Sequence, residues 1–289
     1  MIGAFTTLFS LSAEQKKLLK VKQIQDERVI EEWIKLFTTI ADFDKQGDSG
    51  RNWGCGCAIT GFILTIISIP LIAAYIGLLT LPIAILMLII GLIAYFFLKG
   101  YDVPGEKLTN SVLPILKVLQ EDMNPNEKLK LRLDMRGFEF EEKKTGESQK
   151  YDKGVYYNCV DFYYRDHWME GQATLVDGTQ LIWNVYDLVR NTRKTKRNYR
   201  GKIKTKYKPK HRTYIMLQAG MKNEKYILQD NLKEKGQAGK IVINDSGKRS
   251  WVTIRRTIKH PSGYTFAPED FLMTVASAYN RAGRKGIKK

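Results

Sequence analysis

The sequence predicts a membrane protein with a transmembrane helical hairpin and a separate α+β domain built on a mainly antiparallel sheet. Three observations support this fold class. The 41 residues from Ala58 to Leu98 contain no charged side chain. From Leu129 onward the apolar residues alternate with polar ones, which is the period of a strand. The surplus positive charge is confined to two segments instead of being spread along the chain.

The apolar stretch is long enough for two membrane-spanning helices, since each needs about 20 apolar residues. Within a hairpin covering 55–99, we place the first span at 58–77 and the second at 81–98, with the turn at residues 77–80. Pro70 lies inside the first span and predicts a kink there.

The charges flanking the hairpin predict its orientation. Arg51 precedes it, Lys99 and Lys107 follow it, and the turn is uncharged. Because positive residues stay on the cytoplasmic side, we expect a bacterial inner-membrane protein with both termini and the β domain in the cytoplasm. A turn this apolar also leaves open a re-entrant hairpin. Ala73 and Gly77 form a small-xxx-small pair that favours close helix packing or oligomerisation.

Residues 1–54 predict an amphipathic helix followed by a linker. Ser12 and Gln15 resemble a capping box, and the apolar residues between Ile30 and Ala41 recur on one helical face. We expect one helix from about Ser12 to Phe43. Its apolar face would rest on the soluble domain, pair with a second copy of the chain or lie on the bilayer; the mixture of acids and bases favours the first two.

The remaining chain divides into three parts. Residues 100–127 predict a linker and a short helix, 128–265 a β-rich domain, and 266–289 a closing helix with a basic tail. Asp177-Gly178 stands between two alternating runs and is a strong hairpin signal. About eight short strands, one of them covering Phe138 and Phe140, favour an antiparallel barrel or sandwich.

The basic charge is localised. The chain has 47 Lys and Arg against 30 Asp and Glu, a net charge of +17. Residues 190–212 hold twelve of these cations and residues 281–289 hold five, and neither segment contains an acid. The two segments therefore account for the whole surplus, and the rest of the chain is neutral. Local patches of this kind bind polyanions or membrane surfaces.

Within the basic run the lysines from Lys202 to Lys210 occupy every second position. In an extended strand they would project from one face over roughly 27 Å, with Ile203, Thr205 and Tyr207 on the other. The preceding residues predict a loop or hairpin end with Arg200-Gly201 at the turn. The candidate polyanion-binding residues are Arg193, Lys194, Lys196, Arg197, Arg200, Lys202, Lys204, Lys206, Lys208, Lys210 and Arg212.

Three interpretations of this run stay open. The lysines protect a sheet edge from aggregation, or they hold the domain against anionic lipid head groups, or they bind a nucleotide or nucleic acid, with Tyr199 and Tyr207 stacking on bases. Twelve uncompensated charges exceed what edge protection needs.

The sequence offers little support for an enzyme. His167, His211 and His260 are well separated in the chain, and no metal-binding or phosphate-loop motif is present. Acidic residues flank His167, but alternation along a strand would point neighbours to opposite faces. We therefore expect a non-enzymatic protein without a metal or cofactor.

By layout, residues 58–260 resemble the membrane effectors of bacterial antiphage signalling, which join a two-helix membrane hairpin to a barrel-like cytosolic domain. No motif of this chain matches them residue by residue. The resemblance implies a nucleotide-gated, membrane-disrupting effector as an alternative function. A third is a structural subunit of a membrane complex, assembled through the N-terminal helix and the hairpin.

Overall fold

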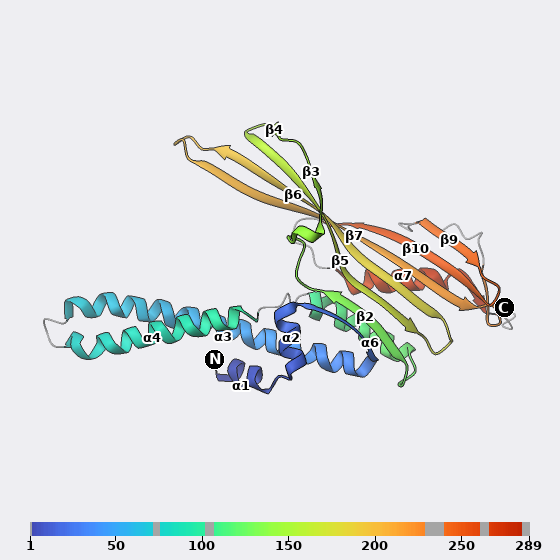
Figure 1. Cartoon of the computed structure of the whole chain (residues 1–289), viewed down its shortest axis with the longest axis horizontal. Helices are drawn as coiled ribbons and strands as arrows, with labels where there is room; N and C mark the ends of the chain where they lie inside the picture. The colour runs from blue at the N-terminus through green and yellow to red at the C-terminus, as the bar shows by residue number, and fades with distance from the viewer. Residues whose placement is uncertain (1, 72–75, 102–106, 229–239, 261–265, 285–289) are drawn as a thin grey trace. The chain divides into compact units, whose positions relative to one another are not determined.

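The computed structural model describes residues 2–71, 76–101, 107–228, 240–260 and 266–284 (Figure 1). The chain forms two compact units. The first comprises Met1–Lys22 and Lys35–Leu108, and the second comprises Gln23–Ile34 and Thr109–Lys289. The first is helical, and the second contains the sheet and the site described below.

The N-terminal region is not the single helix predicted for residues 12–43. Helix α1 spans Ile2–Ser10, α2 spans Ala13–Val21 and α3 spans Ile30–Leu71, with strand β1 (Gln23–Val29) between α2 and α3. The predicted capping box is confirmed, because Ser12 and Gln15 bond reciprocally at the start of α2. Lys22 ends that helix in the left-handed conformation, with φ of +58°. The helix breaks because β1 pairs along its whole length with β2, a long-range contact that local periodicity does not report.

Helices α3 and α4 (Ile76–Lys99) form the apolar hairpin. The turn predicted at residues 77–80 is wrong, because α4 already begins at Ile76. Pro70 lies inside α3. The chain between Leu71 and Ile76 lies outside the described residues, and so does Ala73 of the predicted small-xxx-small pair.

Other small residues let the two helices approach closely. A Cβ atom added to Gly61 would lie 2.6 Å from the Leu88 backbone nitrogen, and one on Gly91 would lie 2.5 Å from that of Ala58. Ser68 and Thr80 also share a hydrogen bond of 2.8 Å between their hydroxyls. Small residues and buried hydroxyls are typical of helix contacts in lipid.

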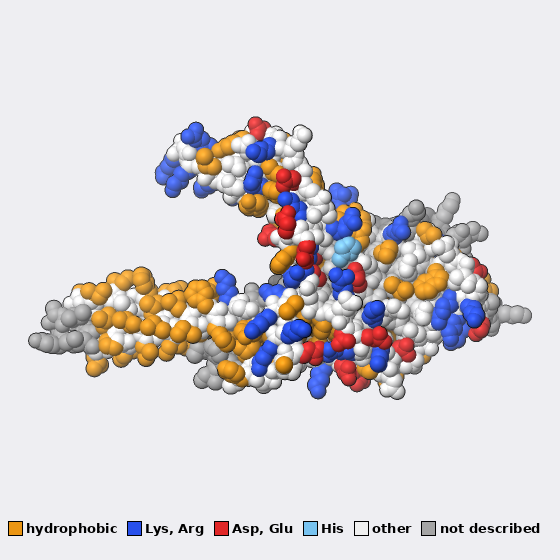
Figure 2. Space-filling view, viewed as in Figure 1, with side chains coloured by type: hydrophobic (Ala, Val, Ile, Leu, Met, Phe, Trp, Pro, Cys, Tyr) orange, Lys and Arg blue, Asp and Glu red, His pale blue; other side chains and the backbone are white. Residues whose placement is uncertain are grey.

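The outer surface of this hairpin is apolar (Figure 2). Ile59, Phe62 and Ile66 of α3 and Leu86 and Ile93 of α4 are each more than half exposed. By length and composition, α3 and the 79–99 part of α4 can each cross a membrane.

The second unit contains an antiparallel sheet of nine strands. They pair in the order β1-β2-β5-β6-β7-β10-β9, with β3 and β4 joined to β5. Their bounds are β2 Lys128–Asp134, β3 Lys144–Glu147, β4 Tyr151–Lys153, β5 Tyr156–Thr174, β6 Gln180–Arg197, β7 Ile203–Lys222, β9 Lys240–Asp245 and β10 Arg249–Lys259. A separate pair joins β8 (Tyr226–Leu228) to β11 (Ala282–Arg284).

The antiparallel prediction is confirmed, but the sheet is open. Among the described strands its two edges, β1 and β9, do not pair with each other, so the predicted barrel or sandwich is replaced by one twisted sheet. The hairpin turn at Asp177-Gly178 is confirmed, with Gly178 at φ +86°. The strand predicted over Phe138 and Phe140 is wrong, since the chain there forms a loop and the short 3₁₀ helix η3 (Glu141–Lys143).

One face of the sheet is covered by helices. Trp183 of β6 packs edge-on against Phe271 of α7 (Pro268–Tyr279), with ring centroids 5.5 Å apart. Helix α6 (Leu113–Asp122) adds three buried leucines and the buried Ile115. The alternate residues of β6 and β7 are half-buried or exposed on the opposite face. Because side chains alternate along a strand, this opposite face can carry a binding surface.

Asp177 ties the β5–β6 turn to the C-terminal elements. Its carboxylate accepts hydrogen bonds from the hydroxyls of Thr179, Tyr226 and Tyr279, at 2.9, 2.7 and 2.9 Å. Burial alone would raise the pKa of Asp177, but the hydrogen bonds from Tyr226 and Thr179 outweigh it and the pKa is lowered. The Asp-Gly turn thereby fixes the end of the sheet that α7 covers.

Candidate polyanion-binding surface

The basic run forms an arm of the sheet. In Figure 1 the far ends of β6 and β7, with β4, extend away from the part of the sheet that α7 covers. We call residues 190–212 the basic arm. Of the loop or hairpin end predicted at its start, the hairpin end is observed, because every residue from Arg190 to Arg197 pairs with β7. The sequence did not predict a strand here, because residues 190–197 lack the alternation of apolar and polar residues that marks one.

The predicted turn of the arm is confirmed. The strands end at Arg197 and Ile203, and Gly201 between them has φ of +78°. The Asn198 side-chain oxygen accepts hydrogen bonds from the backbone nitrogens of Arg200 and Lys202, at 3.1 and 2.8 Å. An Asn side chain that bonds its own following backbone is a common way to stabilise a tight turn.

Strand pairing decides which cations share a face. Lys194 lies opposite Lys206, and Lys196 opposite Lys204. Directly paired residues of antiparallel strands project on the same side of the sheet. We call this side of the arm the lysine face; it comprises Arg190, Lys194, Lys196, Lys204, Lys206, Lys208, Lys210 and Arg212. Like charges placed directly opposite one another destabilise a sheet, so a bound anion would stabilise this arrangement.

The other candidate cations do not join the lysine face. Arg193 projects on the opposite side, with its guanidinium 5.7 Å from the centre of the Phe162 ring. Arg197 donates a hydrogen bond of 3.2 Å to the carbonyl of Gly201 and so closes the turn. Arg200 and Lys202 lie in the turn itself. The eleven predicted cations are therefore divided between two faces and a turn.

The tip of the arm also exposes apolar side chains. Tyr199 is 89% exposed, Ile203 64% and Tyr207 60%. They lie in the turn and on the side opposite the lysine face. Arg200 lies over the ring of Tyr199, 5.2 Å from its centre. The arm thus has one strongly cationic side and an amphipathic tip.

Acidic residues do little to neutralise the lysine face. Asp161 of β5 lies beside Thr192 on this side, but it is buried. It accepts hydrogen bonds from the Thr192 hydroxyl at 2.5 Å and the Tyr151 hydroxyl at 3.2 Å. These two hydrogen bonds join β4, β5 and β6 at the arm.

A bulge in β5 adds a cation that sequence reasoning missed. Below the bulge Met169 pairs with Val185, and above it His167 pairs with Tyr186. Trp168 is the extra residue; it is buried and packs edge-on against Phe266, at 5.4 Å between ring centroids. The shift pairs Arg165 with Leu188.

A row of paired residues then runs across four strands at the base of the arm. Arg165, Leu188, Arg212 and Lys259 are successive partners in β5, β6, β7 and β10. If the pairing of β5 with β6 is extended from the Asp177-Gly178 turn without a bulge, Arg165 comes within one residue of this row. Without the bulge, however, it would pair with Val189 on the covered face. Figure 2 shows the resulting blue side chains on the arm and around its base.

A cavity of about 490 Å³ opens at this row. Among the described residues, its lining includes five cations and no acid: Arg165, Arg190, Lys210, Arg212 and Lys259. His211 and His260, distant in sequence, meet here, with the His260 backbone nitrogen 3.4 Å from the His211 carbonyl oxygen. Burial, reinforced by the nearby His211, lowers the pKa of His260 to about 4. His260 is therefore neutral at physiological pH, and Lys and Arg supply the charge of the cavity.

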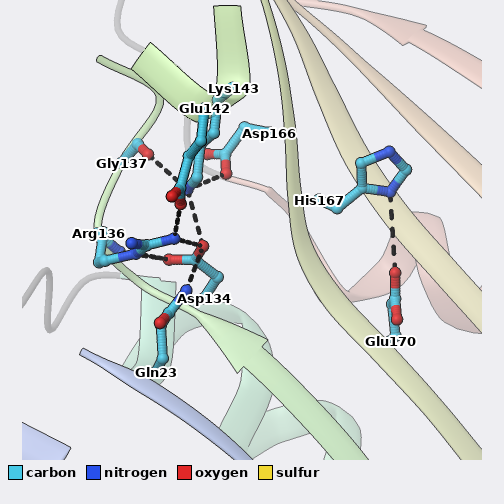
Figure 3. A network of polar contacts seen from close by, with 9 residues as sticks. All are labelled: Gln23, Asp134, Arg136, Gly137, Glu142, Lys143, Asp166, His167 and Glu170. Atoms are coloured by element: carbon cyan, nitrogen blue, oxygen red, sulfur yellow. Dashed lines mark hydrogen bonds and ion pairs between the residues drawn. The ribbon is translucent and has the colours of Figure 1, made fainter. Parts of the chain in front are cut away.

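A buried ionic network fixes the loop beside the arm (Figure 3). The Lys143 ammonium lies 2.6 Å from Asp166, 3.1 Å from Asp134 and 2.6 Å from the Gly137 carbonyl. Arg136 bonds to both Asp134 and Glu142. Although burial opposes ionisation of Asp134, hydrogen bonds from Arg136, and then from Gln23 and Lys143, lower its pKa well below the usual range.

The acids around His167 form no joint site. Asp166 belongs to the Lys143 network, whereas His167 and Glu170 lie together elsewhere (Figure 3). The His167 Nδ1 atom is 3.8 Å from Glu170, and Asn184 bridges the two by hydrogen bonds. Among the described residues no group of three or more His, Cys, Asp or Glu is arranged to hold a metal ion.

Comparisons with protein-family models, with curated proteins and with solved structures find no match to this chain.

Proposed function

We propose that this protein is a membrane-anchored, non-enzymatic protein whose basic arm binds the anionic lipid head groups of a bilayer. The single observation that carries the proposal is the pairing of Lys194 with Lys206 and of Lys196 with Lys204 on one exposed face. A fold that places four ammonium groups opposite one another, without described acids among them, is suited to an extended anionic surface.

The apolar hairpin supports a membrane setting. Its outward residues, such as Phe62 and Ile93, are exposed over helices long enough to cross a bilayer. In the proposed topology both ends of the hairpin face the cytoplasm, because its flanks are basic and its turn is not. The arm and the anionic lipids of the cytoplasmic leaflet are then on the same side of the membrane.

The exposed tip favours lipid over a soluble polyanion. At the end of the arm Tyr199 combines an exposed ring with the neighbouring Arg200, which is the composition of segments that lie at a membrane interface. A nucleic acid would gain from stacking on the tyrosines but not from the exposed Ile203. Each Lys or Arg near an anionic bilayer contributes about 1 kcal/mol, so the five lysines at positions 194, 196, 204, 206 and 208 contribute about 5 kcal/mol.

A vesicle-capture experiment tests the proposal. Full-length protein in phosphatidylcholine nanodiscs is mixed with sucrose-loaded vesicles containing either no phosphatidylglycerol or about one third. We expect sedimentation with the anionic vesicles only, weakening as salt rises. Replacing Lys204, Lys206 and Lys208 together by Gln should lower the partition coefficient about a hundredfold, from the loss of about 3 kcal/mol.

The matched control replaces Lys117, Lys128 and Lys248 by Gln. These exposed lysines lie outside the arm, and replacing them removes the same amount of positive charge as the arm variant. We expect capture by this variant to stay within about twofold of the parent, since distant charges are screened. Equal losses in the two variants would show that only net charge matters and would contradict a specific arm. Failure of the parent to bind anionic vesicles at low salt would refute the proposal.

A further inference from the structure

We propose that the cavity at the base of the arm binds a compact ligand carrying two or more phosphate groups. This site adjoins the lipid-binding surface, since Arg190, Lys210 and Arg212 of the lysine face line it, but the lysines at positions 194–208 do not. Its cations are Arg165, Arg190, Lys210, Arg212 and Lys259. None of the five is among the lysines at positions 194, 196, 204, 206 and 208 of the lysine face.

The fold brings these cations together from four strands. Arg165 comes from β5, Arg190 from β6, Lys210 and Arg212 from β7 and Lys259 from β10. Two adjacent rows of partners contain them all, because Tyr163, Arg190 and Lys210 form the row next to that of Arg165, Arg212 and Lys259. Neighbouring rows on one face are about 7 Å apart, a spacing that several phosphates of one ligand can bridge.

The cations of the cavity are not neutralised within the described residues. No ion pair joins any of the five to a carboxylate in that part of the chain, and the cavity lining contains no Asp or Glu. Five like charges around one opening repel one another. The multiple charge of a polyphosphate would remove this repulsion more completely than a single monovalent anion.

Size and shape favour a small ligand over a surface. The cavity volume of about 490 Å³ falls within the range of ordinary ligand sites. Guanidinium groups such as those of Arg165, Arg190 and Arg212 can each form two parallel hydrogen bonds to one phosphate. The hydroxyl groups of Tyr163 and Thr145, which also line the cavity, can accept or donate hydrogen bonds. A flat bilayer cannot enter such a recess, whereas a chain of phosphates can.

Phosphate chemistry is shared by inorganic polyphosphates and nucleoside polyphosphates, so both are tested. Full-length protein in detergent micelles is titrated calorimetrically with inorganic triphosphate and, separately, with ATP at low salt. Binding of triphosphate supports the proposal. Equal affinity for ATP would assign recognition to the phosphates, and a higher affinity for ATP would assign the natural ligand to the nucleotides.

Variants of residues outside the basic run give the sharpest test. Arg165→Gln and Lys259→Gln should each weaken triphosphate binding about tenfold, because each removes a charge-assisted hydrogen bond. Arg165→Lys, which keeps the charge but not the bidentate geometry, should recover part of the affinity. Both side chains are exposed, so folding should be retained, and the far-UV circular dichroism spectrum verifies this.

The tip variant with Gln at positions 204, 206 and 208 separates the two proposals. We expect it to lose vesicle capture and to keep triphosphate binding within about threefold, since its lysines lie outside the cavity. The Arg165→Gln variant should keep vesicle capture and bind triphosphate about tenfold more weakly. No triphosphate binding by the parent, or an equal loss in the Lys117, Lys128 and Lys248 control, would overturn the cavity proposal and leave the lipid proposal standing.

Discussion

At the scale of single residues, Lys143 is a buried cation held between two buried carboxylates. It is 7% exposed and lies between Asp166 and Asp134, which are 2% and 6% exposed. A buried charge is tolerated only when its partners are also in place. Lys143 therefore links the loop before β3 to strands β2 and β5.

Replacing Lys143 by Met should destabilise the β domain strongly. Two buried carboxylates would lose their shared partner, and breaking such a pair costs about 3–5 kcal/mol. Urea unfolding followed by tryptophan fluorescence measures this free energy, since Trp168 and Trp183 are buried in the same domain. The neighbouring Lys144→Met is the control and should cost far less, because the carboxylates that it meets are exposed. Similar costs in both variants would contradict the role of the network.

The Asp134 carboxylate gives this network a defined pH dependence. Its folded-state pKa lies below the ordinary value of 3.8, so its contribution to stability is present above that value and is lost as the pH falls below it. The destabilisation by Lys143→Met should therefore shrink in acid. Near neutral pH it should not change.

At the scale of elements, the α3–α4 hairpin depends on glycine at two points of close approach. Gly61→Ala and Gly91→Ala each place a methyl group within 2.6 Å of the opposite backbone. Overpacking of this kind costs about 1–3 kcal/mol. Each substitution should lower the temperature at which the helical circular dichroism signal melts in detergent.

Gly56→Ala is the matched control for the hairpin, since an added Cβ there meets no atom within 4 Å. Gly56 lies in α3, as Gly61 does, and its replacement by Ala raises the helix propensity. Its melting temperature should be unchanged or raised. A fall equal to that of Gly91→Ala would show that the lost glycines matter for some reason other than close packing.

The bulge at Trp168 is the element that forms the base of the arm. A slip of one residue moves a strand's side chains to the other face of a sheet. Here the slip puts Arg165 beside Leu188 and places it with Arg212 and Lys259. The buried Trp168 ring stabilises the bulge through its contact with Phe266.

At the scale of the whole molecule, the proposed topology places both ends of the chain on one side of the membrane. Single cysteines at Lys17 and Lys117, in a chain whose Cys55, Cys57 and Cys159 have been replaced, should react with an impermeant maleimide from the same side. That side should be the one exposed in inverted inner-membrane vesicles, because the flanks of the hairpin are basic. Labelling from opposite sides would exclude a hairpin.

Leu79, which is 75% exposed near the start of α4, distinguishes full spans from a re-entrant hairpin. A cysteine at this position should be labelled only from the outer side if the helices cross the bilayer. Protection from both sides would favour the re-entrant alternative.

Local patterns in the sequence correctly predicted several parts of this fold. Alternation identified β2 and the Lys204–Lys210 part of β7. Asp177-Gly178 marked the turn between β5 and β6. These features depend on residues close in sequence. The single helix predicted over β1 was wrong because pairing with β2, about a hundred residues away, outweighs helical periodicity at this point.

The sequence by itself determined that the chain has a long uncharged stretch, an antiparallel domain and one concentrated basic run, because composition and period are local properties. Only the tertiary structure decided which cations share a face. Strand pairing divided the run between two sides, and the bulge at Trp168 brought Arg165 to Arg212 and Lys259. Register depends on contacts between distant strands, so the lysine face and the cavity at its base follow from the fold and not from the order of residues alone.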